Sequence, residues 1–373
     1  MPHRSLHPSP AAPPQTQTPS NAYFLCLQHQ DEPIAWNPFT ERRVVNEHTA
    51  YFGGVFEAME RHLDVSGLTV YLTWRLDELP RYGEDVVAVV MGDEWGRYPP
   101  YANRVRAIFK MLGTDYDLEA HPLRTPLQLM AVTAAKYVRT QPLRLPYLLQ
   151  QWRDRWRGPS WTDGAPVPVH NIPVGYADQD DLPLKPLDER AYDLYFSGSV
   201  SNQEFPWYTP QHWLRTPKDV ARTQLIEAMQ TLRDRRPGAQ VEIDARLSYM
   251  PQRRRSGADV VEERSYSEMM MDTRICPVPR GTRIETPRLY EAMRYGCVIV
   301  TEPLPDRWYT RGLPALILHD WADLPDVAAA LLDDPDRMQA LHQQALAWWR
   351  SVCSEAPVGR FMADKINAAF HRS

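Results

Sequence analysis

Residues 276–301 read CPVPRGTRIETPRLYEAMRYGCVIVT, and this stretch decides the fold of the second half of the chain. Thr286 can cap a helix with its hydroxyl, and Pro287 then stands at the first helical position, where its missing N–H costs nothing. Gly296 is placed to end that helix in a left-handed conformation, before an apolar run typical of a buried strand. The stretch therefore predicts strand, loop, short helix and strand, the repeating unit of a parallel α/β sheet.

The N-terminal end of this predicted helix, residues 287–295, is suited to bind an anion. Its unpaired backbone N–H groups and its positive dipole end point at the preceding loop. Arg280, Arg283 and Arg288 add guanidinium groups that suit phosphate. Glu291 lies one turn after Arg288 and could accept hydrogen bonds from a ribose diol. The same spacing also allows a plain surface ion pair between Arg288 and Glu291, so the residues alone leave both readings open.

Strands and helices alternate on both sides of this stretch, which predicts a parallel α/β sheet in each half. The run at 85–91, DVVAVVM, is continuously apolar and favours a strand buried on both faces. The predicted strands span residues 23–27, 68–73, 85–91, 105–111, 193–196, 240–244, 274–278 and 298–301. The predicted helices span residues 54–63, 220–233, 266–271 and 287–295, together with one or two helices in 128–156 that Pro142 and Pro146 break.

Length and composition set the broad class. The chain has 373 residues, and at roughly 150 residues per domain this favours two domains. Lys and Arg number 42 against 47 Asp and Glu, a net charge of −5 that argues against a dedicated nucleic-acid binder but not against small phosphorylated ligands. No apolar run approaches the roughly 18 to 20 residues of a membrane span, and the start lacks a signal-peptide pattern, so we expect a cytoplasmic protein. The scattered cysteines predict buried free thiols, at Cys26, Cys276, Cys297 and Cys353.

The segment at 265–300, SYSEMMMDTRICPVPRGTRIETPRLYEAMRYGCVIV, resembles the C-terminal domain of exostosin-like glycosyltransferases. That family pattern is an aromatic-initiated helix, a strand leading to Pro-x-Gly, then Ser/Thr-x-Arg-Leu-x-Glu/Asp-Ala and Gly-Cys. The upstream YDLYFSGSV at 192–200, followed by Arg222, looks like the family's strand, Gly-Ser turn and helix-borne arginine. The likeness covers roughly residues 190–330. The matching positions are Pro279, Gly281, Thr286, Arg288, Leu289, Glu291, Ala292, Gly296 and Cys297.

The resemblance implies an α/β fold of the GT-B type, with two Rossmann-like domains whose parallel sheets face a central cleft. Residues 1–20 would be a disordered Pro-rich tail, 21–172 the acceptor-side domain, 173–350 the nucleotide-sugar domain, and 351–373 a C-terminal helix that crosses back. Glu291 would hold the ribose, Arg288 and Thr286 the diphosphate, and Arg280 the phosphates or the sugar, with Arg283 as a further cation around the same donor site. The opposite wall of the pocket would be formed by Ser197, Gly198 and Arg222.

The implied activity is transfer of a sugar from a nucleotide diphosphate donor, with UDP- and GDP-sugars favoured, to a hydroxyl acceptor in a bacterial glycan or glycoconjugate. The helix dipole and the guanidinium groups would stabilise the departing diphosphate, so no metal or other cofactor is expected. The acceptor, whether a glycan, a lipid-linked, a peptide or a small-molecule hydroxyl, belongs to the half that matches no motif. A non-catalytic nucleotide-binding scaffold or sensor that keeps the GT-B fold is the alternative.

Inverting transfer needs a general base from the first domain. Asp93 and Glu94 follow a buried strand, where parallel sheets place their ligand sites, and His48 lies in the loop after the first strand. Each of the three could equally be an ordinary loop residue, and a retaining enzyme would need no such base.

Four weaker signals favour structural interpretations. The DxD sequences at 115–117 and 178–180 lack a convincing preceding strand and are not expected to bind metal. Arg253–Arg255 favours a solvated loop over an anion site. Trp207 and Trp213 could stack on sugars, whereas Trp348 and Trp349 are expected to pack in a C-terminal helix. A Ser or Cys hydrolase is not favoured, because the sequence has no GxSxG elbow and Cys297 stands at the start of a predicted buried strand.

Overall fold

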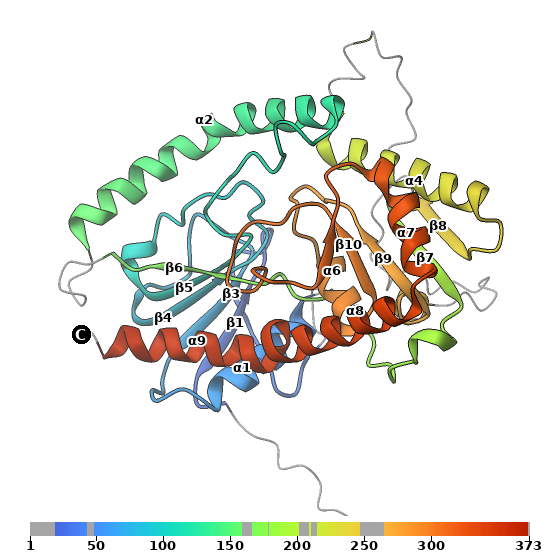
Figure 1. Ribbon diagram of the computed structural model, residues 1–373. Coiled ribbons are helices and arrows are strands. Elements are labelled where there is room, and N and C mark those ends of the chain that lie inside the picture. The colour runs from blue at the N-terminus through green and yellow to red at the C-terminus, as the bar shows by residue number, and fades with distance from the viewer. Residues whose placement is uncertain are drawn as a thin grey trace, which may run out of the picture.

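The molecule is built on two β-sheets with helices packed around them (Figure 1). The computed structural model describes residues 19–42, 48–158, 166–177, 179–200, 209, 215–246 and 265–371. Within these ranges the strands form one six-stranded and one five-stranded sheet. The predicted class, α/β with a Rossmann-like parallel sheet in each half, is confirmed in this architecture, which is consistent with the expected GT-B type.

The first sheet has the strand order β2-β1-β3-β4-β5-β6. β2 runs antiparallel to β1, and the other neighbouring pairs are parallel. The valine-rich segment 86–90 in β4 is fully buried, because both faces of the sheet are covered. The strands are β1 (Ala22–Cys26), β2 (Ile34–Ala35), β3 (Thr69–Thr73), β4 (Gly83–Val90), β5 (Val105–Met111) and β6 (Val169–Ile172).

The second sheet has the order β11-β10-β9-β7-β8, and its neighbouring strands are all parallel. From β7 the chain first adds β8 on one side and then β9, β10 and β11 on the other. The order therefore reverses between β7 and β9, where a doubly wound sheet has its ligand crevice. The strands are β7 (Tyr192–Ser199), β8 (Val241–Arg246), β9 (Thr273–Val278), β10 (Val298–Thr301) and β11 (Ala315–Ile317).

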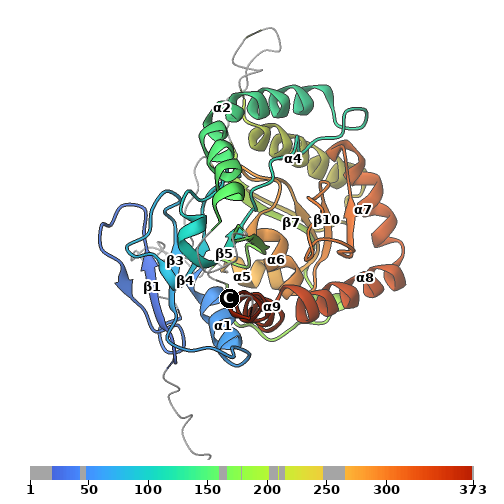
Figure 2. The ribbon, with the colours of Figure 1, turned by 90° about the vertical axis from the view of Figure 1, so that its left-hand side faces the viewer.

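Helices cover both sheets, and the last of them returns to the first half. In Figure 1, α2 runs along the top of the molecule and α1, α8 and α9 along the bottom, and Figure 2 shows α9 beside α1. A Cβ at Gly359 would lie 2.4 Å from Val55 O, so glycine permits the close approach of α9 to α1. The helices are α1 (Thr49–Glu60), α2 (Leu127–Arg157), α4 (Pro217–Arg235), α5 (Tyr266–Met271), α6 (Pro287–Arg294), α7 (Leu324–Leu332), α8 (Pro335–Trp348) and α9 (Glu355–Phe370).

The carboxyl ends of the two sheets face each other. Arg307, which follows β10, donates from Nη2 to the carbonyl oxygen of Leu112 after β5, at 2.5 Å. Trp308 Nε1 donates to Asn171 O in β6 at 2.8 Å. Arg283, which follows β9, donates to Glu94 O after β4 at 3.3 Å. These contacts join the two halves at the edge where parallel sheets place their ligands.

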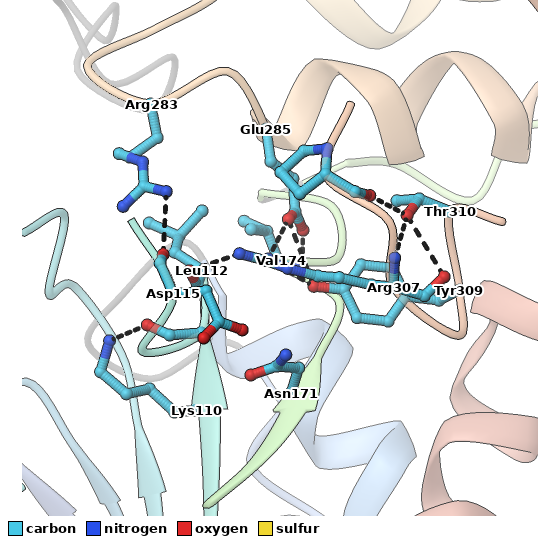
Figure 3. Close-up of polar contacts among 12 residues, drawn as sticks. Lys110, Leu112, Asp115, Asn171, Val174, Arg283, Glu285, Arg307, Tyr309 and Thr310 are labelled. Carbon is cyan, nitrogen blue, oxygen red and sulfur yellow. Dashed lines mark hydrogen bonds and ion pairs between the residues drawn. The ribbon is translucent and has the colours of Figure 1, made fainter. Parts of the chain in front are cut away.

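Arg307 forms several hydrogen bonds at this junction between the halves (Figure 3). Its Nη1 donates to Glu285 Oε2 at 2.6 Å and to Tyr309 Oη at 2.8 Å. The other carboxylate oxygen of Glu285 accepts from Tyr290 Oη at 2.6 Å and from the backbone N–H of Val174 at 3.3 Å. The Glu285 side chain is 1% exposed and that of Arg307 5%. A fully partnered ion pair is therefore buried between the halves and the chain that connects them.

Several elements differ from the sequence-based expectation, which also did not include β2 and α7. α2 is one continuous helix through Pro142 and Pro146, although each proline lacks the N–H that would bond the carbonyl oxygen four residues earlier. β6 was not predicted, because its four residues VHNI carry no strand periodicity. β11 was likewise not predicted, since it is only three residues long.

We predict that Glu285→Ala lowers the free energy of unfolding by about 3–5 kcal/mol, because it leaves the Arg307 charge buried without its carboxylate. Urea denaturation followed by circular dichroism measures this change. Asp306→Ala is the control: it breaks the neighbouring Asp306–Arg311 pair, whose side chains are 70% and 72% exposed, and should leave the midpoint almost unchanged. Equal midpoints for the two variants would contradict the structural role of the buried pair.

Candidate functional site

The order reversal between β7 and β9 brings several predicted site residues together. Ser197 and Gly198 lie at the carboxyl end of β7, and the loop after β9 leads to the first turn of α6. α6 begins with Thr286 as its N-cap and Pro287 at the first position, and Gly296 follows it with φ of +67°. These features of the 276–301 segment are confirmed.

The Thr286 hydroxyl does not cap the helix, which corrects the expected hydrogen bond. Its Oγ1 is buried and has no hydrogen-bond partner among the described residues. Arg288, two residues on, donates from Nη2 to Ser197 O, while its Nη1 is buried and finds no hydrogen-bond partner in the part of the chain that the structure describes. A buried donor without a partner costs about 1–3 kcal/mol, so the first turn of α6 presents polar atoms that a bound anion could satisfy.

Two guanidinium groups converge above one aromatic ring. The Cζ atoms of Arg288 and Arg222 lie 4.9 and 6.0 Å from the centroid of the Phe196 ring. Arg222 comes from α4 and donates from Nη1 to Ser199 O at 2.8 Å and from Nε to Arg280 O at 3.2 Å. Burial, and then the positive charge of Arg288, lower the pKa of Arg222 to about 10. The pair is a desolvated double positive charge, which favours an anionic ligand.

Glu291 projects from α6, the helix that carries Arg288, and is already hydrogen-bonded. Its carboxylate accepts from Tyr266 Oη at 2.8 Å and from the backbone N–H of Ala177 at 3.2 Å, and the residue is 5% exposed. Ser197 Oγ donates to Asp244 Oδ2 at 3.0 Å. A Cβ at Gly198 would lie 3.1 Å from Arg222 Nη1, so glycine leaves room for that guanidinium. Glu291 is thus a fixed anionic acceptor beside the two arginines.

Arg280 and Arg283 do not join this cluster, which corrects the expectation that three arginines surround one place. Arg280 donates from Nε to Glu302 Oε1 and from Nη2 to Glu119 O, at 2.8 and 2.7 Å. Arg283 forms an ion pair with the Glu119 carboxylate, and its Cζ lies 4.5 Å from the centroid of the Tyr116 ring. Both side chains bridge the halves, and a direct phosphate contact would require these bonds to open.

Asp93 is the most strongly paired of the three candidate bases. Its Oδ2 accepts from Lys110 Nζ at 2.9 Å and its Oδ1 from Arg97 Nε at 2.9 Å, and the residue is 5% exposed. Burial alone would raise the pKa of Asp93, but the Lys110 charge and the Arg97 hydrogen bond outweigh it and hold the pKa below its usual value. A carboxylate that is stabilised in this way is a weak proton acceptor.

The pKa of Glu94 is shifted in the opposite direction to that of Asp93. Burial raises its pKa above the usual value, against the lowering effects of a Thr282 hydrogen bond and the charges of Lys136, Arg283 and Lys218. These neighbours come from both halves, so the Glu94 carboxyl lies in the gap between the sheets. A carboxylate with a raised pKa is a better general base than a fully paired one.

His48 precedes the first turn of α1 and lies beside Tyr176, in the segment that connects the two halves. Burial lowers its pKa to about 4, and a hydrogen bond with the Tyr176 backbone opposes this shift. Ala177, the next residue, is the one that donates to Glu291. The imidazole is therefore neutral at pH 7, and the connecting segment links it to the α6 cluster.

A pocket of about 430 Å³ lies beside Glu94, between α2 and the start of α4. It is basic, because four of its lining side chains are cations. Burial and the charge of Arg222 lower the pKa of Lys218, so the pocket and the arginine pair are close enough to interact. The sequence analysis missed these cations, although Lys136 and Arg139 stand one helical turn apart. The pocket is lined by Trp95, Val132, Ala135, Lys136, Arg139, Arg215, Thr216, Pro217, Lys218, Asp219 and Thr282.

The remaining sequence-based predictions have mixed outcomes. All four cysteines are free and buried, and Trp349 packs in the core at 7% exposure, both as predicted. Asp178, Trp207, Trp213 and Arg253–Arg255 lie outside the described residues. Among those that are described, no group of three or more His, Cys, Asp or Glu side chains could hold a metal ion. In the same part of the chain, every helix is too short or too polar to cross a membrane.

Comparison with known proteins gives little further information. No protein-family model and no curated protein sequence matches the chain. Among solved structures, the chain is similar to one described as a GtfA/B complex, with 12% identity and a TM-score of 0.38. The similarity covers 78% of this chain and 58% of that chain, so this chain spans less than two thirds of its length. A likeness at this TM-score supports no conclusion about function, and the exostosin-like resemblance stays a prediction.

We predict that Thr286→Val leaves the melting temperature of the free protein unchanged or raises it, since the buried hydroxyl has no partner to lose. Thr273→Val is the matched control, because the Thr273 hydroxyl is buried and donates to Met269 O at 2.6 Å. That variant should lose about 1 kcal/mol of unfolding free energy. Differential scanning calorimetry compares the two, and equal destabilisation would show that Thr286 is bonded in the free protein.

Proposed function

We propose that the protein is a glycosyltransferase that takes a sugar from a nucleotide diphosphate donor held at the carboxyl ends of β7 and β9. One observation carries the proposal. Arg222 and Arg288, from two different helices, are placed together over Phe196 at the reversal of the strand order. A doubly wound sheet binds its ligand at such a point, and a desolvated pair of guanidinium groups suits a diphosphate.

The diphosphate would bind between these arginines and the first turn of α6. There the unpartnered Thr286 Oγ1 and Arg288 Nη1 gain acceptors, so binding removes a cost that the free protein bears. Departure of the nucleoside diphosphate builds negative charge, which the two guanidinium groups and the helix N-terminus stabilise. The proposed chemistry therefore needs no divalent ion to neutralise the leaving group.

Glu291 would accept hydrogen bonds from the ribose hydroxyls. Tyr266 and Ala177 hold its carboxylate, so the orientation of this hydrogen-bond acceptor is fixed before the ligand arrives. UDP- and GDP-sugars are the donors to test first. The sugar would then extend toward the gap between the sheets, where Glu94 lies.

Glu94 is the proposed general base of an inverting transfer. It comes from the first half, it contacts groups of the second half through Thr282 and Arg283, and its pKa is raised by burial. Lys218 is near both places, since its charge lowers the pKa of Glu94 and the charge of Arg222 lowers the pKa of Lys218. Asp93, by contrast, would serve to hold the loop through Lys110 and Arg97.

We expect Arg288→Gln and Arg222→Gln each to weaken binding of UDP or GDP by about tenfold or more, the loss of one charge-assisted hydrogen bond. Isothermal titration calorimetry measures the dissociation constants. Arg274→Gln is the control, because the Arg274 guanidinium pairs with Asp193 at 2.8 Å at the other end of β9. If the wild type binds no nucleoside diphosphate, or if all three variants bind as it does, the donor site is wrong.

Glu291→Gln separates ribose recognition from phosphate recognition in the same titrations. This variant should weaken the nucleoside diphosphate and leave inorganic pyrophosphate unchanged, whereas Arg288→Gln should weaken both. Equal weakening of pyrophosphate by Glu291→Gln would mean that Glu291 only supports the arginines.

We expect Glu94→Gln to lower the rate of sugar transfer, or of donor hydrolysis by water, about a hundredfold or more, with the donor dissociation constant unchanged. The wild-type rate should fall as the pH drops through the raised pKa of Glu94, because protonation removes the base, and the variant should lose this dependence. Release of the nucleoside diphosphate provides the measurement.

Glu78→Gln, an exposed change in the same half, is the control for this experiment. Full activity of Glu94→Gln would exclude Glu94 as the base. Tight nucleotide binding by the wild type without turnover of any donor would instead support the non-catalytic alternative.

A further inference from the structure

The outward face of α2 is apolar, which is unusual for a surface helix. Six of its residues expose between 55% and 77% of their surface. At about 100° per residue they fall within an arc of about 60°, so they form one continuous stripe along the helix. We call this the α2 stripe, and its members are Leu127, Val138, Leu145, Leu149, Trp152 and Trp156.

The opposite face of α2 is the one that packs on the protein. Leu129, Val132 and Thr133 are buried near its start, and Arg144 and Asp154 farther along. A surface helix normally has polar residues opposite such a face. The stripe therefore lies opposite a completed internal packing surface, and contiguous exposed apolar surface of this kind marks an interaction site.

The charge of α2 indicates what the stripe contacts. The helix contains six Lys or Arg residues and one acidic residue, Asp154, in a chain whose net charge is −5. Arg153, Arg155 and Arg157 are exposed beside the two tryptophans. Because salt screens charges beyond about 8–10 Å, a surface near α2 meets this local positive field and not the negative total.

A second copy of this chain does not fit that charge. A symmetric contact through the stripe would bring the arginines of one α2 toward those of the other. An anionic bilayer fits both properties: tryptophans favour the level of the lipid headgroups, and flanking arginines pair with the phosphates. The two rings already lie side by side, 6.1 Å between centroids.

We propose that the α2 stripe docks this protein on an anionic lipid bilayer. The helix lies on the membrane surface, with Trp152 and Trp156 among the headgroups. The other flank of α2 supplies Lys136 and Arg139 to the basic pocket beside Glu94.

Vesicle sedimentation of the full chain tests the docking. The probes are phosphatidylcholine vesicles with and without about 30% phosphatidylglycerol. The wild type should sediment with the anionic vesicles, and Trp152→Gln/Trp156→Gln should bind them about tenfold more weakly or worse. Leu143→Gln/Leu184→Gln is the matched control, because both leucines are exposed and neither lies on the stripe. The control should bind within about twofold of the wild type.

A second variant keeps the test independent of how the tryptophan variant folds. Arg153→Gln/Arg155→Gln/Arg157→Gln should lose the preference for anionic vesicles, at about fivefold per charge. The proposal is overturned if the wild type sediments with neither vesicle, or if both variants bind as the wild type does. It is equally overturned if analytical ultracentrifugation shows a dimer that Trp152→Gln/Trp156→Gln dissociates, because a second copy then covers the stripe.

Nucleotide titration of the tryptophan variant distinguishes this proposal from the proposed function. Its dissociation constant for UDP or GDP should equal that of the wild type, because the stripe lies outside the donor site. Vesicle binding without any nucleotide binding would overturn the glycosyltransferase and leave the docking intact. Nucleotide binding without vesicle binding would do the reverse.

Discussion

The contact of three arginines with the loop after β5 sets the arrangement on which the rest of the structure depends. Arg307 reaches Leu112 O, and Arg280 and Arg283 both reach Glu119. Each of these arginines follows a strand of the second sheet, so together they fix the two carboxyl edges against one another. Trp308, which donates to Asn171 O, adds to this link between the halves. The price of this arrangement is that three buried charges must remain paired.

This clamp explains why the cations of the site divide into two groups. Arg280 and Arg283 are occupied by Glu302 and Glu119, whereas Arg222 and Arg288 contact backbone oxygens of β7, and among the described residues Arg288 Nη1 has no hydrogen-bond partner. The first group determines how far apart the sheets lie, and the second is available to a ligand. Glu94 lies close to Arg283 of the first group, and burial raises its pKa although the positive charges nearby lower it.

Local chemistry predicted α6 well, because Pro287 and Gly296 act through their own backbone and need no partner. The destination of each arginine was not predictable in the same way. Arg280, Arg283 and Arg288 look alike in the sequence, and what distinguishes them is their partners. Arg288 donates to Ser197 O, more than ninety positions away, and Arg283 pairs with Glu119, which is farther still. The same limit applies to α2: Pro142 and Pro146 indicate a break, and the helix nevertheless continues through both.

The packing of α9 on α1 has a consequence for motion. Because β1 and α9 both lie in the first half, two segments lead from it into the second half and back, the segment before β7 and the turn after α8. Two such segments restrict the relative motion of the halves more than one would, because any displacement must be accommodated at both of them at once. Gly359, far from the arginine pair, helps to hold the second segment in place, because it lets α9 lie directly against α1.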